Sequence, residues 1–452
     1  MLPSILSSLN IELTPCQAKA DAALRGSQNV FLTGGAGSGK SFLIRHFLRT
    51  QNLREFPVLA STGAAAVLIG GRTFHSFFGL GILEGGVEAT VEKAAKNRQV
   101  VRRLKKIRGF IVDEVSMLSG PTLRAAEIIA RRVRESDLPW GGLRVIAVGD
   151  FAQLPPIERG NSQRRGWAFL DSVWTFSGFE TQFLRTQTRC KDEEYMRVLA
   201  DVREGRVSPL VRDYLNSKIG PVADDFEGTR LFPRRDETER FNLGKLDSLS
   251  GQAVRFETVY SGDSRAVESL KKYSPLPDAL FLKENALIML RQNDPQGRWV
   301  NGTTGHITAI KPNELKIELL NGRIIEIEKT SFSLLDAEGN VTAAATNFPV
   351  SLAWASTIHK SQGATLDKMM VNLSNLWEPG QAYVALSRLQ QGADLSVEKW
   401  DARSIRVDPD VVNFYRVREA AAEAKAAAPD SPQAEPAAGT MAGPGGQTEL
   451  DV

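Results

Sequence analysis

The sequence predicts an α/β fold in which a parallel sheet carries helices on both faces and is interrupted by a small β module. Short apolar runs closed by glycine or an acid recur at residues 29–33, 110–112 and 145–148. Helical spacing of apolar residues follows the first run over residues 41–49. This strand–loop–helix alternation is typical of a parallel sheet that buries both faces. Regular alternation of apolar and polar residues within 290–330 predicts the β module.

A further helix is predicted over residues 121–134. Proline stands near its start, and three arginines stand near its end, where they complement the helix dipole. Buried-strand character returns at residues 350–355 and 368–373. The β module is therefore expected to interrupt an α/β unit that resumes after it.

The strongest local signal in the β module is a hairpin. Apolar residues alternate with polar ones over residues 315–319 and again over 325–327. Asn321-Gly322 lies between these two runs and predicts a type I′ turn.

Composition places the chain among ordinary globular proteins. It has 452 residues, which suggests roughly three domains, and its hydrophobic and charged fractions of 42% and 24% exclude collagen-like, disulfide-rich and wholly disordered classes. Cys16 and Cys190 are too few for a disulfide framework or a four-thiolate zinc site. No apolar run reaches about 18 residues, and the start lacks the features of a secretory signal. We therefore expect an intracellular protein without a membrane segment, cytoplasmic and nucleoid-associated in a bacterial-type cell, with an organellar or nuclear location left open.

The last residues differ from the rest. Residues 420–452 are rich in Ala, Pro and Gly and carry a net charge of −4, which leaves +7 on the preceding 419 residues. Such a segment buries too little apolar surface to offset its ordering entropy, so we expect a disordered tail after a helix that begins near residue 410. The basic body suits a polyanionic partner, although many proteins that never bind nucleic acid share this balance.

A complete phosphate-binding loop follows the first predicted strand. The sequence GGAGSGKS spans residues 34–41, between a strand and a helix. Backbone N–H groups and the helix N-terminus are expected to bind phosphate oxygens. Lys40 should reach the β- and γ-phosphates, and the Ser41 hydroxyl should ligate Mg²⁺. The predicted nucleotide-binding residues of this loop are Gly35, Ala36, Gly37, Ser38, Gly39, Lys40 and Ser41.

Two acids end the next predicted strand. Asp113 and Glu114 follow residues 111–112 and should emerge at the carboxyl edge of the sheet, beside the phosphate loop. Asp113 is then placed for the Mg²⁺ shell, and Glu114 for orienting or deprotonating the attacking water. Paired acids favour hydrolysis over nucleotide binding alone.

A third predicted strand ends in residues 148–156, which contain Gln153. Its amide could bond a γ-phosphate or a water, or it could be an ordinary glutamine in a turn stiffened by two prolines. Spacing alone leaves both interpretations open.

These segments, taken together, resemble superfamily-one helicases, and most closely the Pif-one DNA helicases, which are related to RecD. The resemblance covers roughly residues 10–400 and rests on GGAGSGKS at 34–41, STGAAA at 61–66, TFHSF at 73–77, IVDEVSML at 111–118, VGDFAQLPP at 148–156, TIHKSQG at 357–363 and AYVALSR at 382–388. It implies an ATP-dependent DNA helicase that uses Mg²⁺ and moves 5′ to 3′ on single-stranded DNA.

The resemblance also implies a domain plan with two RecA-like P-loop motor domains. The first would span residues 1–180 and contain a small wedge insertion at 79–101. The second would span 181–289 and 346–409, interrupted by an SH3-like β insertion at 290–345. Residues 410–452 would form the C-terminal helix and the disordered tail.

Roles at the nucleotide follow from the same resemblance. Gln153 is identified as a γ-phosphate sensor, and Arg388 as the arginine that reaches the γ-phosphate from the second motor domain. Arg189 would be a second such arginine, although its neighbours Thr188 and Cys190 depart from the family pattern. Gln17 would read adenine, and Gln362 and Gly363 would couple the nucleotide to the DNA strand.

A DNA-binding track needs cations for the phosphates and flat groups for the bases. Thr62, Gly63, His75 and Phe77 suit this track in the first motor domain, whereas Phe74 and Phe78 are expected in the core. By resemblance, the same track continues in the second motor domain through Thr357, His359, Lys360 and Ser361.

The resulting prediction is an ATPase, stimulated by DNA, that separates duplexes. Single-stranded DNA and duplex–single-strand junctions would be its partners, and a monomer is expected because the motor closes within one chain. A RecD-type translocase that acts only in a complex remains open as an alternative. TIHKSQG and ALSR argue against a small-molecule kinase, because a kinase needs no second motor domain. Glu114 and Arg388 argue against a binding module without turnover.

Overall fold

The computed structural model describes most of the chain. The described residues are 12–62, 65–66, 72–81, 83, 85–156, 165–187, 190, 192–220, 226–274, 276–294, 296–335 and 341–427. Within these ranges, no helix has both the length and the apolar character that crossing a bilayer demands.

The first α/β unit is built on a six-stranded sheet in the order β3-β2-β4-β5-β1-β6, and every neighbouring pair is parallel. Its strands are β1 (Val30–Gly34), β2 (Val58–Ala60), β3 (Arg72–Thr73), β4 (Gly109–Asp113), β5 (Arg144–Val148) and β6 (Glu180–Leu184). Its helices are α1 (Pro15–Arg25), α2 (Lys40–Leu48), α4 (Phe74–Phe78), α5 (Gly86–Ala95), α6 (Arg98–Lys106), α7 (Gly120–Arg134) and α8 (Ser172–Phe176).

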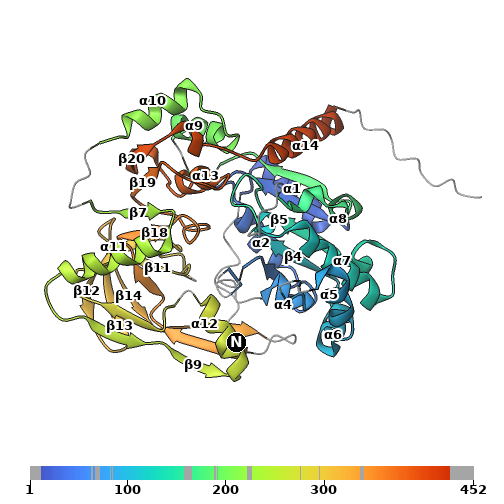
Figure 1. Cartoon of the computed structure of the whole chain (residues 1–452), viewed down its shortest axis with the longest axis horizontal. Helices are drawn as coiled ribbons and strands as arrows, with labels where there is room; N and C mark the ends of the chain where they lie inside the picture. Colours follow the sequence, from blue (N-terminus) through green and yellow to red (C-terminus); the bar gives the residue numbers. More distant parts are fainter. Residues whose placement is uncertain are drawn as a thin grey trace, which may run out of the picture.

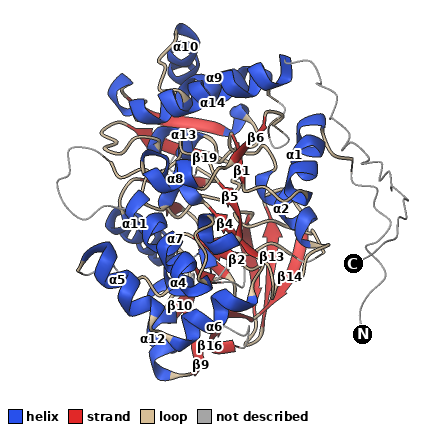
Figure 2. Cartoon of the chain, turned by 90° about the vertical axis from the view of Figure 1, so that its right-hand side faces the viewer, coloured by secondary structure: helices blue, strands red, loops and turns tan. Residues whose placement is uncertain are grey.

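Helices cover both faces of this sheet, as the sequence predicts. On β1, Val30 and Leu32 pack against α1 and α2, whereas Phe31 faces the cluster that contains α7. Figure 2 shows α1 and α2 on one side of the strands and α7 and α8 on the other. Because the carboxyl ends of parallel strands share one edge, β1, β4 and β5 deliver their following loops to the same place.

The second α/β unit holds a four-stranded parallel sheet in the order β18-β7-β19-β20. Its strands are β7 (Thr229–Phe232), β18 (Ala355–Thr357), β19 (Met369–Leu373) and β20 (Leu395–Trp400), and its helices are α9 (Glu193–Arg203), α10 (Pro209–Ser217), α11 (Arg235–Ser248) and α13 (Gln381–Leu386). The predicted α/β class with two parallel sheets is confirmed.

The β module lies beside the second unit (Figure 1) and is antiparallel. Its main sheet has the order β14-β13-β12-β11-β17, and a second sheet has the order β15-β16-β9. The elements are β8 (Val254–Glu257), β9 (Val259–Gly262), α12 (Ser264–Tyr273), β10 (Ala279–Leu282), β11 (Leu287–Leu290), β12 (Thr304–Ile310), β13 (Glu314–Leu319), β14 (Ile324–Glu328), β15 (Thr330–Leu335), β16 (Val341–Asn347) and β17 (Val350–Leu352). The module therefore extends beyond residues 290–345 on both sides.

Two local expectations need correction. The run 350–355 is divided, because β17 pairs with the β module and β18 with the second parallel sheet. The hairpin turn is not type I′, because Gly322 has φ +79° whereas Asn321 keeps a negative φ. Leu319 and Arg323 flank a three-residue loop, closed by a 2.8 Å bond from Gly322 N to Leu319 O. That geometry is a type I turn followed by a left-handed glycine.

Two predicted boundaries also differ from the observed elements. β6 pairs with β1 along its whole length, so the first sheet extends past residue 180 to Leu184. Helix α14 (Pro409–Ala427) continues beyond residue 420, where the tail was expected to begin. Alanine has the highest helix propensity, and this explains why the alanine-rich stretch prolongs the helix. Residues 428–452, for which disorder is predicted, lie outside the described residues.

The predicted wedge region, 79–101, contains α5 and the first turn of α6, which continues to Lys106. Their apolar residues Val91, Ala94, Val100 and Leu104 are buried in the same cluster as α7. The segment is thus an integral part of the first unit's helical layer, and its action as a wedge stays a prediction.

Candidate nucleotide and nucleic-acid site

The phosphate loop joins β1 to α2 and needs its glycines. Gly34, Gly37 and Gly39 have φ values of +152°, +80° and +88°. A Cβ at Gly34 would lie 2.4 Å from Leu184 O, so a side chain there would force β6 away from β1. Lys40 begins α2, and its Nζ donates to Gly34 O at 2.7 Å and to Gly35 O at 3.1 Å. Burial lowers the pKa of the Lys40 ammonium, against the opposing effect of Asp150 and Glu114.

The acids Asp113 and Glu114 stand at the end of β4. Glu114 adopts a left-handed conformation with φ +52°, and its N–H donates to Asp113 Oδ1 at 3.0 Å. Burial, together with the neighbouring Asp113 carboxylate, raises the pKa of Glu114 to about 7. Glu114 Oε2 is buried and has no hydrogen-bond partner among the described residues. A carboxylate with a raised pKa and a free acceptor oxygen suits a general base.

Gln153 lies beyond β5 and is only 5% exposed. Its Oε1 lies 3.4 Å from Gln362 Nε2, so the loop after β5 meets the loop after β18 in the second unit. Gly363 follows Gln362 with φ +78°. The two glutamines therefore bridge the two α/β units.

Arg388 is a buried cation, 2% exposed, just after α13. Its Nε donates to Val384 O at 2.7 Å, and its Nη1 donates to Ser361 O at 3.3 Å. Main-chain carbonyls thus hold the guanidinium in a fixed direction. Its positive charge, which comes from the second unit, acts to lower the pKa of Glu114 in the first unit.

One cavity of about 210 Å³ collects these groups. Lys40 and Glu114 enter it from the first unit, and Arg388 and Gly363 enter it from the second. The residues that line it are Ala36, Gly37, Gly39, Lys40, Ser41, Phe42, Arg45, Glu114, Gln153, Gly363 and Arg388. The two units therefore share a single site, as the motor interpretation requires.

The polar groups at this site fit a nucleoside triphosphate with Mg²⁺. Ser38 Oγ is buried without a hydrogen-bond partner among the described residues, next to the loop's backbone N–H groups. Ser41 lines the cavity, and burial raises the pKa of Asp113 above its usual value. A carboxyl group destabilised by burial gains from a nearby cation, so Asp113 suits a metal ligand, as the Ser41 hydroxyl does, although Asp113 itself does not line the cavity.

Sequence reasoning missed several residues at this site. Tyr383, from α13 of the second unit, accepts a 2.8 Å bond from Ala36 N of the phosphate loop. It lies within the AYVALSR segment, which offered a signal, but only Arg388 was assigned from it. Phe42 and Arg45 also line the cavity, and their spacing along α2 predicted only a helix.

Not every predicted nucleotide residue reaches the cavity. Gln17 is 3% exposed, and its Oε1 accepts from Thr14 N at 3.1 Å in a capping box at the start of α1. It does not line the cavity, so its reading of adenine stays a prediction. Arg189 lies outside the described residues, as does Gly63 of the DNA track.

The DNA-track residues of the first unit differ in accessibility. Thr62 Oγ1 accepts from Ala65 N at 3.2 Å, and burial lowers the pKa of the half-buried His75. Phe77 is only 3% exposed, and the Arg103 guanidinium lies 5.1 Å from its ring centre. This burial argues against base stacking by Phe77. Phe74 and Phe78 are fully buried, as predicted.

The residues of the second unit follow β18. His359 Nε2 lies 3.3 Å from Glu378 Oε2, and Lys360 is exposed. Thr357 accepts from Lys360 N at 3.1 Å, and so it shapes the loop. Ser361 is fully buried and donates to Ile358 O at 2.8 Å. Its burial argues against a direct DNA contact, whereas its carbonyl supports Arg388.

Comparisons with known proteins agree with this geometry. A family model described as PIF1-like helicase matches residues 16–211. The ATP-dependent DNA helicase Pif1 of Bdellovibrio bacteriovorus is 52% identical over 416 residues, which cover 92% of this chain and 94% of that protein. The chain belongs to the PIF1-like helicase family. A zebrafish (Danio rerio) member, ATP-dependent DNA helicase PIF1, is 36% identical, and the match covers 88% of this chain and 63% of that protein.

Solved structures of family members share the fold. The Bacteroides sp. Pif1 complex with ADP-AlF4 aligns with a TM-score of 0.80 at 28% identity, over 91% of this chain and 98% of that one. The Candida albicans Pif1 helicase aligns with a TM-score of 0.72 at 31% identity, over 90% and 99%. A Bacteroides Pif1 structure with ADP-AlF3 and single-stranded DNA aligns with a TM-score of 0.62 at 28% identity, over 91% and 98%.

Proposed function

We propose that this chain is an ATP-dependent DNA helicase that translocates 5′ to 3′ on single-stranded DNA and unwinds duplexes. The observation that carries the proposal is the shared cavity, which Lys40 and Arg388 enter from different α/β units. Membership of the PIF1-like helicase family supports it, as do the relatives crystallised with ADP-AlF4 and with single-stranded DNA.

The residues divide the chemistry between the two units. Lys40 and the N–H groups of the phosphate loop bind the triphosphate. Glu114 accepts a proton from the attacking water, and Gln153 orients that water or the γ-phosphate. Arg388 stabilises the charge that develops on the γ-phosphate, from the opposite wall. Ser41 and Asp113 would hold Mg²⁺, which neutralises phosphate charge when bound.

Coupling to DNA follows from the junction between the units. Gln153 and Gln362 meet at this junction, and the loop that contains Gln362 also carries His359 and Lys360. A change in the distance between units then changes the spacing of DNA contacts. We propose that Thr62, His75, His359 and Lys360 contact the strand, that α5 and α6 lie at the duplex junction, and that the β module closes over the strand.

The wider assignments are proposals of the same kind. We propose RecA-like motor domains over the two α/β units, a monomeric motor and an intracellular, cytoplasmic location. A RecD-type translocase that works only within a complex is the second candidate. No residue of the cavity favours this translocase over a helicase that works alone. Unwinding of a duplex by the purified chain would distinguish the two candidates.

The decisive test compares ATPase activity of the wild type, Lys40→Ala and Arg388→Ala, with and without single-stranded DNA. Both variants should lose DNA-stimulated hydrolysis by about 10³-fold or more while retaining DNA binding. Lys19→Ala, an exposed lysine on α1, is the matched control and should behave as wild type. Hydrolysis in the Lys40→Ala variant at the wild-type rate would refute the nucleotide site.

Direction and unwinding need a second experiment. Duplexes with a 5′ or a 3′ single-stranded overhang should be offered to the wild-type protein with ATP and Mg²⁺. Unwinding of the 5′-tailed duplex alone is expected. Stimulated hydrolysis without unwinding of either duplex would favour the translocase, and no stimulation by DNA would contradict both candidates.

A further inference from the structure

A buried carboxylate beside the nucleotide site, Asp150 of the VGDFAQLPP segment, binds side chains of α9 and α14. Neither of these helices contains a helicase-like motif. Asp150 follows β5 and is fully buried. Arg203, at the end of α9, donates to it through Nη2 at 2.9 Å and Nε at 3.2 Å. α9 packs beside α13 of the second unit, so this ion pair crosses between the two α/β units.

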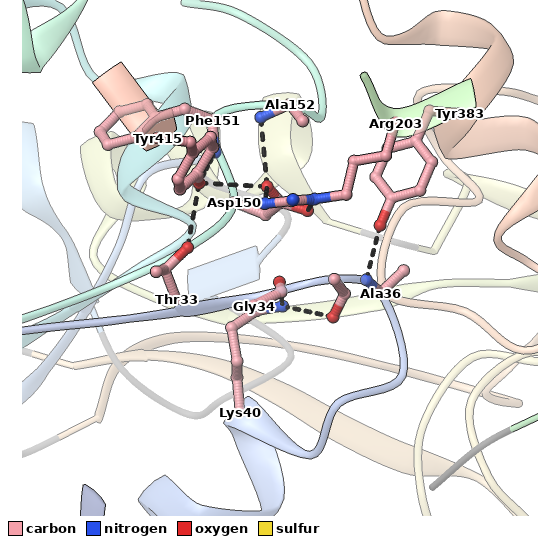
Figure 3. A network of polar contacts seen from close by, with 11 residues as sticks. Thr33, Gly34, Ala36, Lys40, Asp150, Phe151, Ala152, Arg203, Tyr383 and Tyr415 are labelled. Atoms are coloured by element: carbon pink, nitrogen blue, oxygen red, sulfur yellow. Dashed lines mark hydrogen bonds and ion pairs between the residues drawn. The ribbon is translucent and has the colours of Figure 1, made fainter. Parts of the chain in front are cut away.

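Tyr415 of α14 completes the network (Figure 3). Its hydroxyl lies 3.1 Å from Asp150 Oδ1, 2.9 Å from Thr33 Oγ1 and 2.8 Å from Phe151 N. A carboxylate oxygen only accepts, so the Tyr415 proton goes to Asp150. The tyrosine oxygen then accepts from Phe151 N and from the Thr33 hydroxyl. Every bonding position of this hydroxyl is therefore used.

The rest of α14 fixes the tyrosine in place. The Arg203 guanidinium lies 4.6 Å from the Tyr415 ring centre. The neighbouring Phe414 stacks on Phe169 at 4.4 Å and meets Phe151 edge-to-face at 5.5 Å. α14 follows the second unit in sequence, yet these contacts place its first half on the first unit (Figure 1).

The network contacts the ends of both strands that carry the nucleotide site. Thr33 immediately precedes Gly34, whose carbonyl accepts from Lys40. Asp150 lies three residues before Gln153, and its Oδ1 also accepts from Ala152 N at 3.2 Å, so it shapes the Gln153 loop. One hydroxyl thereby sets the distance between the phosphate loop and the loop of the γ-phosphate sensor.

We infer that Tyr415 is a positioning residue for ATP hydrolysis, acting with the Asp150–Arg203 pair to hold the phosphate loop and the Gln153 loop in register. This inference rests on the proposed function and extends the hydrolytic machinery to α14, which contains no helicase-like motif. Tyr415 touches neither the cavity nor the reacting atoms, so its effect passes through Thr33 and Asp150.

The test is Tyr415→Phe, which removes the hydroxyl and keeps the ring against Arg203 and the aromatic cluster. The kcat of DNA-stimulated ATP hydrolysis should fall about 10- to 100-fold, because displacing a catalytic loop by about 1 Å has an effect of this size. The KM for ATP should change less than about threefold, since the groups that bind the triphosphate remain. The double variant Tyr415→Phe/Asp150→Asn should have a kcat no lower than that of the more impaired single variant, because both residues act through the same hydrogen-bond network.

Two controls separate positioning from folding. Tyr260→Phe removes a hydroxyl that bonds Asp278 at 2.8 Å in the β module, and it should leave kcat unchanged. Val133→Ala on α7 removes buried apolar contacts away from the network, so it should lower the unfolding midpoint while keeping kcat within about twofold of wild type. The inference is overturned if Tyr415→Phe is fully active, or if Val133→Ala loses kcat equally at equal loss of stability. A wild-type chain without DNA-stimulated ATPase would overturn the proposed function and this inference together, whereas an active Tyr415→Phe overturns only the latter.

Discussion

Asp150 is a residue whose environment makes its charge both costly and necessary. Burial by itself raises the pKa of this carboxyl, but the charge and hydrogen bonds of Arg203 outweigh burial and lower it below the usual value. A buried carboxylate of this kind is stable only while its partners are present. The same holds in reverse for Arg203, so neither residue of the pair can be replaced alone without cost.

Asp150→Asn should therefore lower the free energy of unfolding by about 3–5 kcal/mol at pH 7, since Arg203 loses its partner. A pKa lower in the folded than in the unfolded chain gives stability that is present above about pH 4 and is lost as pH falls through the folded-state pKa. The difference between wild type and variant should thus stay constant from pH 7 to about 5 and shrink below about 4.

Urea unfolding across this pH range measures the effect. Asp21→Asn is the comparison, because Asp21 pairs with the exposed Arg25 on α1, and the loss of this pair should cost only about 0–1 kcal/mol. An Asp150→Asn effect of that small size would contradict the account of the buried pair.

At the scale of elements, the critical contact lies between the loop after β5 and the loop before α13. Gly380 is the N-cap residue of α13 and has φ +80°, and its N–H donates to Arg406 O at 3.0 Å. A Cβ at this position would lie 2.4 Å from Gln153 O and 2.7 Å from Ala152 O. Only a residue without a side chain lets these two loops approach so closely.

Gly380→Ala should push the Gln153 loop and α13 apart and lower kcat for ATP hydrolysis about 10²-fold, since Gln153 and Arg388 then no longer share one geometry. Steady-state ATPase with saturating single-stranded DNA measures this. Gly251→Ala is the matched control, because Gly251 has a similar φ of +87° but nothing within 4 Å of its Cβ position. Equal losses in both variants would attribute the effect to backbone strain rather than to the contact.

For the whole molecule, the two α/β units share one continuous core. The largest cluster of buried apolar residues contains Phe31 of β1 together with Leu231 of β7 and Val371 of β19. Most of the β module packs in a second cluster around Ile307, Leu315 and Ile317, whereas Leu287 and Met289 of β11 belong to the shared core. A shared core predicts that the two α/β units unfold together, whereas the β module can unfold separately.

Hydrogen exchange followed by mass spectrometry, at increasing urea, should give β1 and β19 the same opening free energy, because each unit loses apolar contacts when the other unfolds. β13 of the β module is the internal comparison, and its opening free energy can be lower than that of β1 and β19. Opening of β19 well before β1 would show that the units are energetically independent, and the shared core would then not be a unit of stability.

The α/β class, the phosphate loop, the paired acids and the β hairpin can all be predicted from the order of the residues alone. These features depend on residues that are close in sequence, such as Gly34 to Ser41, or on a periodicity that repeats over a few residues. Chain geometry then fixes the result, because parallel strands bring their carboxyl ends to one edge. Arg388 was also found from the sequence, although only the resemblance gave it a role.

The side chains that meet across the junction of the two units become visible only in the folded chain. Tyr383 and Ala36 are 347 residues apart, and Tyr415 and Asp150 are 265 apart, so no local pattern could announce either contact. The same is true of Phe77 and Ser361, whose burial depends on neighbours supplied by other elements. Hydrogen bonds and packing act between side chains that the fold brings together, whatever their distance along the chain.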